Sequence, residues 1–267
     1  MKNKIKYFAA LLVISLAVFA TIESSKLGLN NLFGGFVSEC EAIAEVNGNS
    51  RILKLLKART SSNTCEEIYD RMMPRQQLRL SNIPDLRLVK YLKNLESLDL
   101  QLGAEFVDWD SFGELSELKK LTISSMNSAV IDLSFLTHLN KLEVLHLAGL
   151  KVKSGVTIGT AKNLQELIIV KGDLVDLSLI EACPVLKKLD LSFNRIQSVE
   201  ALKNCKNLEV LVLSSNKVQS LEPLSSLPQL KYLTAIMNEV TNFTGIENSE
   251  SLLSLIHISE PTRLGMI

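Results

Sequence analysis

The sequence has 267 residues, and its 29 lysines and arginines balance its 29 aspartates and glutamates to a formal net charge of zero. This balance gives no electrostatic reason to expect binding to nucleic acid or to an anionic membrane surface. The length suits one large domain or two small ones. Leucine dominates the apolar residues, which indicates a repeated environment rather than the mixed core of an ordinary globular domain.

The first 22 residues have the pattern of a secretory signal peptide. Three lysines in "MKNKIKY" precede the apolar run "FAALLVISLAVFA", and Val18 and Ala20 place small residues where a signal peptidase cleaves. A membrane span needs about 20 apolar residues, so this run is too short for a comfortable one. We therefore predict a secreted, cell-surface or periplasmic bacterial protein that has no membrane span after cleavage of its signal. The alternative is an uncleaved anchor.

Residues 23–75 do not repeat, and they are predicted to form a small helical N-terminal cap or linker. "CEAIAEVNGNSRILKLLKART" and "CEEIYDRMM" have helical apolar spacing around an "NGNS" turn. A repeat array needs a cap over its exposed apolar end, and this segment stands at the position of one. The chain has four cysteines, of which Cys40 and Cys65 lie in this segment. In an exported protein they form either a disulfide or two thiols.

Residues 76–252 repeat with a period of 22. "LKKLDLSFNRIQSVEALKNCKN" begins at Leu186, and similar segments begin at Leu208 and Leu230, each 22 residues after the one before. Leu164 and Leu142 keep the same step, while looser copies begin at Leu118 and Leu95 and a partial copy precedes them. About seven or eight repeats are predicted, a number typical of stacked repeat architectures.

Each repeat has a pattern with a direct structural meaning. Leu189 and Leu191 alternate as in a strand with one buried face, and Asn194 follows where the chain must turn. Apolar residues then recur at every third position, which suits 3₁₀ turns better than an α-helix. These positions are Ile196, Val199, Leu202 and Cys205. Stacked repeats of this kind form a curved α/β solenoid, with a parallel β-sheet on the concave side and 3₁₀ or irregular segments on the convex side.

The pattern resembles the leucine-rich repeat family. Its 22-residue form, "LxxLxLxxNxIxxLxxLxxLxxL", is most similar to the internalin-type repeats of bacterial surface proteins, and the resemblance covers Leu78 to Leu252. The chain departs from this pattern where Gly103, Leu150 and Gly172 replace the turn asparagine. The resemblance implies the horseshoe fold and a role in recognition or adhesion.

The C-terminal residues 253–267 leave the pattern. Leu252 and Leu255 continue the period, but the next positions do not, and "LSLIHISEPTR" is identical to the translation of a common transposon-end sequencing adapter. We therefore predict that this segment is not native and that the natural repeats are truncated. The alternative is a degenerate last repeat.

No catalytic, cofactor-binding or metal-binding set is found in the sequence. His138 and His146 lack the spacing of metal ligands, and no phosphate-binding or dinucleotide-binding motif occurs. Cys183 and Cys205 are 22 residues apart and are therefore interpreted either as core residues or as a disulfide between repeats. We expect a protein without enzymatic activity of its own. The alternative is the substrate-recognition part of a larger enzyme.

The predicted binding site lies on the concave face. Residues that alternate with the buried leucines point away from the core, and on a solvated strand they should be polar. Here several are apolar, which is typical of a partner site, although strands also favour β-branched residues and a missing C-terminal part could cover them. The predicted partner is a protein or a surface glycan. The residues are His146, Ile168, Val170, Asp190, Val210, Val212, Tyr232 and Ile236.

Overall fold

The computed structural model describes residues 30–45, 51–83, 86–103, 106, 108–153, 158, 161–180, 184–246 and 251–256. The chain divides into two compact units, residues 1–73 and residues 74–267, which are described separately. The predicted signal peptide lies outside the described residues.

The first unit is helical, as the apolar spacing predicted. Residues 30–45 form a helix, followed by α2 (Arg51–Thr60) and α3 (Cys65–Met72). Helix α3 begins at Thr64, whose hydroxyl accepts a hydrogen bond from the backbone N–H of Glu67 at 3.2 Å. This cap satisfies one of the N–H groups that have no partner within the helix.

A disulfide and a cluster of aromatic rings join these helices. Cys40, in the helix over residues 30–45, is bonded to Cys65 at the start of α3, and their Cα atoms lie 5.9 Å apart. The ring centroids of Phe33 and Phe36 lie 5.3 and 5.2 Å from that of Tyr69. Because this unit is small, a covalent link adds stability that its core alone cannot supply.

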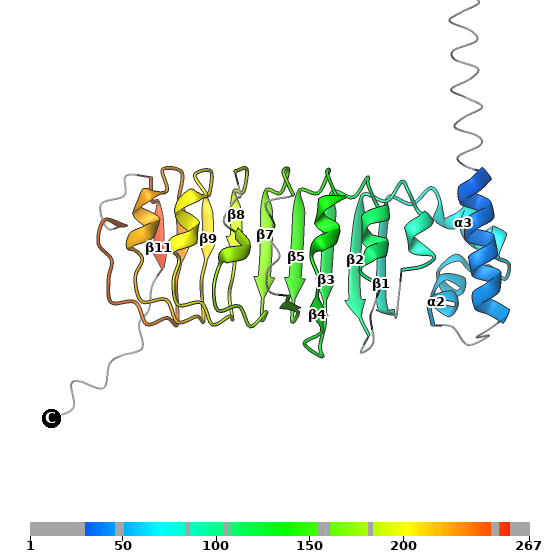
Figure 1. Ribbon diagram of the computed structural model, residues 1–267, viewed down its shortest axis with the longest axis horizontal. Helices are drawn as coiled ribbons and strands as arrows, with labels where there is room; N and C mark the ends of the chain where they lie inside the picture. The colour runs from blue at the N-terminus through cyan, green and yellow to red at the C-terminus, as the bar shows by residue number, and fades with distance from the viewer. Residues whose placement is uncertain are drawn as a thin grey trace, which may run out of the picture. The chain divides into compact units, whose positions relative to one another are not determined.

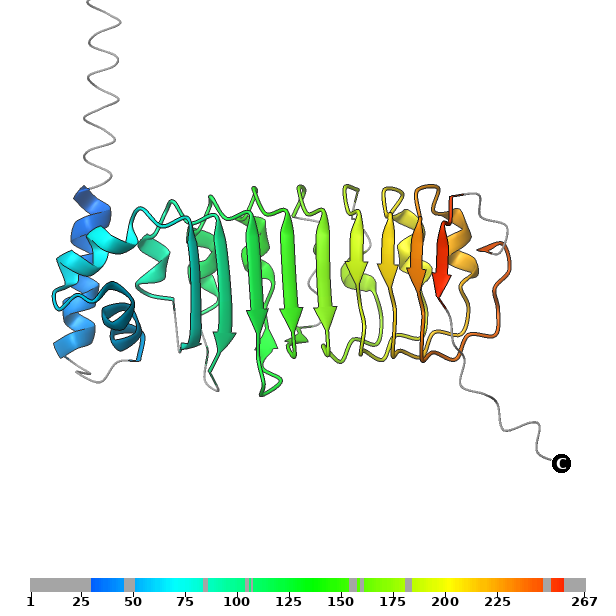
Figure 2. The ribbon, with the colours of Figure 1, turned by 180° about the vertical axis from the view of Figure 1, so that it is seen from behind.

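The second unit is built on a parallel sheet of nine described strands, whose order in space follows their order in the chain. Figures 1 and 2 show the strands side by side, with the return segments in a second layer, which lies in front of the strands in Figure 1 and behind them in Figure 2. The strands are β1 (Gln77–Ile83), β2 (Ser97–Leu102), β3 (Lys120–Ser124), β5 (Val144–Ala148), β7 (Glu166–Val170), β8 (Lys188–Asp190), β9 (Val210–Val212), β10 (Tyr232–Thr234) and β11 (Ser254–Ile256).

The return segments are 3₁₀ turns, which confirms the prediction from the three-residue spacing. The six described 3₁₀ turns lie between successive strands of the main sheet and bury apolar side chains against it. Their bounds are η1 (Val89–Tyr91), η2 (Asp110–Glu114), η3 (Ser134–Thr137), η5 (Ser178–Ile180), η6 (Glu200–Asn204) and η7 (Glu222–Ser226).

One column of leucines forms the centre of the core. Successive strands pair through these positions, for example Leu167 with Leu189 and Leu189 with Leu211. All of the column is essentially inaccessible to solvent, and it comprises Leu98, Leu121, Leu145, Leu167, Leu189, Leu211 and Leu233. The repeats therefore stack in the register that the 22-residue period predicts, and the fold is a curved leucine-rich repeat solenoid.

Turn asparagines join consecutive repeats. The side-chain Nδ2 of Asn194 donates hydrogen bonds to the carbonyl oxygens of Ile169 and Leu191, both at 2.8 Å. Asn216 and Asn238 repeat this arrangement one and two repeats later. These three side chains are buried and satisfy backbone groups that the sheet leaves unpaired, so they hold the turns of the last repeats in place.

The earlier turns differ because Gly103, Leu150 and Gly172 replace the turn asparagine. There a second, two-stranded parallel sheet forms from β4 (Val130–Ile131) and β6 (Lys151–Val152). At the other end of the main sheet, β11 pairs with β10 in the regular register. Residues 257–267 lie outside the described residues, so the non-native origin of residues 253–267 stays a prediction. Cys183 also lies outside them, while Cys205 is buried.

Candidate protein-binding face

The solvent-facing side of the nine-stranded sheet, here called the sheet face, carries the predicted binding residues. His146 lies on β5, Ile168 and Val170 on β7, and Asp190 on β8. Val210 and Val212 lie on β9, Tyr232 on β10, and Ile236 two residues beyond it. All eight alternate with buried core residues and are half-buried or exposed, so the structure brings them together on one side of the sheet.

Two rows of the sheet face follow directly from the strand register. One row pairs His146 with Ile168, Ile168 with Asp190 and Asp190 with Val212. The neighbouring row runs through Glu166, Lys188, Val210 and Tyr232. Strands pair about 4.8 Å apart, so neighbours within a row lie close enough for one ligand to contact several of them.

The apolar side chains gather on the C-terminal half of the sheet face. Ile168, Val170, Val210 and Val212 lie within three consecutive strands, and 48% of Tyr232 is exposed beside them on β10. On β2 and β3 the positions that face the same way are all polar, namely Ser97, Asp99, Gln101, Lys120, Thr122 and Ser124. Because those strands form without apolar outward residues, strand propensity alone does not account for the apolar half.

A charged cluster borders this apolar half. Glu166 Oε1 lies 2.9 Å from both His146 Nε2 and Lys188 Nζ, so one carboxylate oxygen joins three adjacent strands. Burial alone would raise the pKa of the Glu166 carboxyl, but the hydrogen bonds and charges of Lys188 and His146 hold that pKa below its ordinary value. Of these three residues, only His146 is predicted from the sequence as part of the site. Glu166 and Lys188 are 22 residues apart, so the repeat period could have identified their pairing.

Asp190 is oriented by its own turn. One carboxylate oxygen, Oδ1, accepts hydrogen bonds from the backbone N–H of Ser192 at 2.9 Å and from its hydroxyl at 2.6 Å. Within the described part of the chain, the other oxygen, Oδ2, accepts no hydrogen bond and is therefore the one left to a ligand. A partner that contacts the row from His146 to Val212 would therefore meet a fixed acidic group between apolar neighbours.

The turns that follow the strands carry exposed apolar side chains that the sequence pattern does not predict. Two of them occupy equivalent positions in the repeats of β8 and β10. They are Phe193, with 56% of its surface exposed, and Met237, with 59%. Both have left-handed backbone angles, with φ of 59° and 56°. Their exposure depends on this turn geometry, which apolar periodicity does not indicate.

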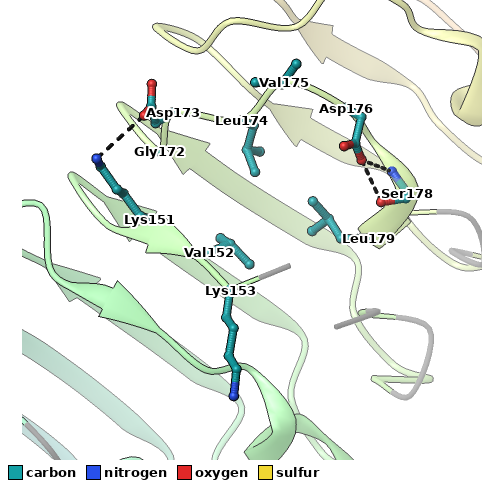
Figure 3. A pocket seen from close by; sticks show the side chains of 10 residues that line it. All are labelled: Lys151, Val152, Lys153, Gly172, Asp173, Leu174, Val175, Asp176, Ser178 and Leu179. Carbon is teal, nitrogen blue, oxygen red and sulfur yellow. Dashed lines mark hydrogen bonds and ion pairs between the residues drawn. The ribbon is translucent and has the colours of Figure 1, made fainter. Parts of the chain in front are cut away.

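Turns on this side of the repeats also line two open hollows, which share Lys151 and Asp173. Figure 3 shows the one of about 280 Å³, where Lys151 reaches Asp173 while Asp176 accepts hydrogen bonds from Ser178. The other, of about 370 Å³, is bounded by Lys171, Phe193 and Arg195. Neither belongs to the sheet face as defined above.

Among the residues that the structure describes, no group of three or more His, Cys, Asp or Glu side chains is placed to hold a metal ion. Within the same ranges, no helix has both the length and the apolar character to cross a membrane.

Comparisons with known proteins identify the type of repeat. Residues 184–239 match the family model described as leucine rich repeat. Internalin C2 of Listeria monocytogenes strain 4b F2365 is similar in structure, with a TM-score of 0.62 and 20% sequence identity over 77% of this chain and 91% of that one. The comparison with curated protein sequences found no match.

Two longer internalins of Listeria monocytogenes have a similar fold. InlF of strain 4b F2365 matches with a TM-score of 0.63 and 22% identity over 80% of this chain and 64% of that one. InlP matches with a TM-score of 0.66 and 18% identity over 80% and 64%. The chain thus spans less than two thirds of either protein. At these identities the comparisons show a common fold, the internalin-like leucine-rich repeat.

Proposed function

We propose that this chain, with its internalin-like leucine-rich repeat fold, is an exported scaffold that binds a partner protein on the sheet face. The observation that carries the proposal is the contrast between the two halves of that face. Strands β2 and β3 display polar residues, whereas β7, β9 and β10 display Ile168, Val170, Val210, Val212 and Tyr232. Exposed apolar groups beside an oriented carboxylate and a charged cluster are typical of the centre and rim of a protein interface.

The rigidity of the scaffold supports this proposal. The side chains of the sheet face alternate with a fully buried leucine column, and the turns of the last repeats are held by buried asparagines. A rigid surface loses little conformational freedom when a partner binds. Because the half-buried valines and isoleucines have few rotamers to lose, most of their contact area would contribute to affinity.

Export is supported by two independent features. The N-terminal residues have the composition of a signal peptide, and the structure contains the Cys40–Cys65 disulfide, which is typical of oxidising compartments. N-terminal sequencing of protein released by the producing cell tests this part of the proposal. We expect a mature chain that begins soon after Ala20, whereas released protein that still begins at Met1 would contradict cleavage.

The binding proposal is tested with a panel of purified extracellular proteins and glycans, followed by variants. For each binder found, we expect Val212→Glu to weaken binding by about tenfold or more, because it places a charge at the centre of the apolar half. Gln229→Glu is the matched control, since residue 229 is exposed and lies in the turn before β10 rather than on a strand. Equal affinity of both variants for every binder would contradict the sheet face as the site. A glycan as the sole binder would contradict a protein partner.

A further inference from the structure

Phe193 is an exposed aromatic residue in a turn where neighbouring repeats place small, charged or flexible side chains. Its backbone φ is 59° and 56% of its surface is exposed. The equivalent residues Lys171, Ser215 and Met237 have φ of 54°, 58° and 56°, so the left-handed geometry belongs to the turn itself. The fold therefore tolerates a serine at this position, and a phenylalanine is not needed to form the turn.

Phe193 borders a hollow of about 370 Å³ that also contains Lys151, Lys171, Asp173 and Arg195. Three cationic side chains thus face one carboxylate. Asp173 is shared, because its oxygens lie 2.8 Å from Arg195 Nε and 3.6 Å from Lys151 Nζ; Figure 3 shows the contact with Lys151. The balance of charge within the hollow is positive.

Lys171 supplies the uncompensated charge next to the aromatic ring. Its Nζ lies 5.8 Å from the centroid of the Phe193 ring, which is within the range of a cation–π interaction. Within the described ranges, no carboxylate lies at ion-pair distance from Lys171. In contrast, Lys153 beside the adjoining hollow is paired with Asp132 at 2.9 Å. A ligand carboxylate at Lys171 would therefore form an ion pair without displacing one.

We propose that this hollow is a second interaction site, separate from the sheet face, that binds an acidic segment of a protein. A carboxylate of that segment pairs with Lys171, and the adjacent apolar side chain packs on the Phe193 ring. Arg195 is already paired with Asp173, so it attracts the carboxylate of the ligand only at longer range. A purely apolar ligand would remove water from the Lys171 ammonium and supply no opposite charge, which costs free energy. We therefore expect the ligand to carry a carboxylate.

Asp173 argues against a polyanion as the ligand. Its carboxylate lies within the hollow between Lys151 and Arg195, so closely spaced phosphates or sulfates would be repelled by it. A single carboxylate avoids that repulsion by binding on the Lys171 side. The combination of one available ammonium, one exposed ring and one central acid thus selects a singly charged group next to an apolar one.

The test uses the ¹⁵N-labelled full chain titrated with acetyl-Asp-Leu-amide and, as a neutral control, acetyl-Asn-Leu-amide. We expect saturable shifts of the backbone amides of residues 171–174 and 193–195 with the Asp peptide, and several-fold weaker binding of the Asn peptide. Equal binding of the two peptides, or no saturable shift, would overturn the proposal. Tighter binding of tripolyphosphate or of a heparin disaccharide would also overturn it, in favour of a polyanion or glycan site.

Variants assign the effect to the two residues. Phe193→Ser reproduces the serine of the next repeat, and Lys171→Gln removes only the charge, so both should fold. We expect each to lose binding of the Asp peptide at least several-fold. Lys217→Gln, in the next repeat and outside the hollow, is the matched control and should bind as the unmodified chain does. If the control loses as much binding as Lys171→Gln, the effect comes from overall charge and the site is not the one proposed.

Discussion

Asn194 and Gly172 occupy equivalent positions in consecutive repeats and fit together. Oδ1 of Asn194 accepts a hydrogen bond of 2.9 Å from the backbone N–H of Gly172. A Cβ atom at residue 172 would lie 3.2 Å from that oxygen and 2.9 Å from Cγ2 of Ile169. The glycine that breaks the asparagine pattern in the sequence is thus the residue that leaves room for the first asparagine of the regular repeats.

We expect Gly172→Ala to lower the free energy of unfolding by about 1–3 kcal/mol, because the methyl group overpacks a site that has no space for it. Chemical denaturation followed by circular dichroism measures the change. Gly34→Ala is the matched control, because residue 34 is helical and a Cβ there would have no atom within 4 Å. It should be neutral or slightly stabilising, since alanine favours helices.

Asn194→Ala should lower the free energy of unfolding by more than the loss of a few side-chain atoms suggests. The side chain accepts from the backbone of Gly172 and Leu174 and donates to the carbonyls of Ile169 and Leu191. Its removal leaves buried backbone groups unpaired, so we expect a loss of at least about 2 kcal/mol in the same denaturation experiment. Asn204→Ala, at an exposed position, should change stability by less than about 0.5 kcal/mol. Similar losses for the two variants would contradict the structural role of Asn194.

Reduction of the Cys40–Cys65 disulfide should destabilise the helical unit. The bond closes a loop with a sequence separation of 25, for which loop-closure entropy predicts a loss of about 3.5 kcal/mol on reduction. We expect the helical circular dichroism signal to melt at lower temperature in a reducing agent. The double variant Cys40→Ala/Cys65→Ala should melt at that lower temperature with or without the reducing agent. A melting temperature of the native chain that does not respond to reduction would show that the bond adds no stability.

The charge of Glu166 should contribute stability at neutral pH. Its folded-state pKa is lowered, so this contribution is present above the pKa of the unfolded chain, about 4.3, and is lost as the pH falls through the folded-state pKa. Glu166→Gln should therefore cost about 1 kcal/mol at pH 7 and nearly nothing in strong acid. Glu143→Gln, at an exposed position of the preceding repeat, controls for the loss of one negative charge and should cost less at pH 7 than Glu166→Gln.

The repeat period predicts the features of the fold that depend on apolar side chains and on regular turns. Equal spacing forces Leu167, Leu189 and Leu211 into one buried column, and the same spacing aligns Asn194 with Asn216. The sheet face could be predicted for the same reason, because strand residues alternate between core and solvent. The proposed role of that face is a separate question that the period does not answer.

Other features depend on contacts that a periodic pattern does not contain. The exposure of Phe193 follows from a left-handed turn, and apolar residues are ordinarily assigned to the core. The hollow beside it combines Lys151, Lys171 and Arg195 from three repeats, which no local motif links. The β4–β6 sheet forms between the repeats that begin at Leu118 and Leu142, at positions to which the regular pattern assigns no strand.

The most direct test of the proposed function is site-specific photo-crosslinking to a partner protein found in the binding panel. The crosslinking residue benzoylphenylalanine is placed at position 212, on the sheet face, or at position 219, beyond the turn, in otherwise unmodified chains. We expect a covalent adduct with the partner from position 212 and none from position 219. An adduct from position 219 with none from position 212 would contradict binding through the sheet face.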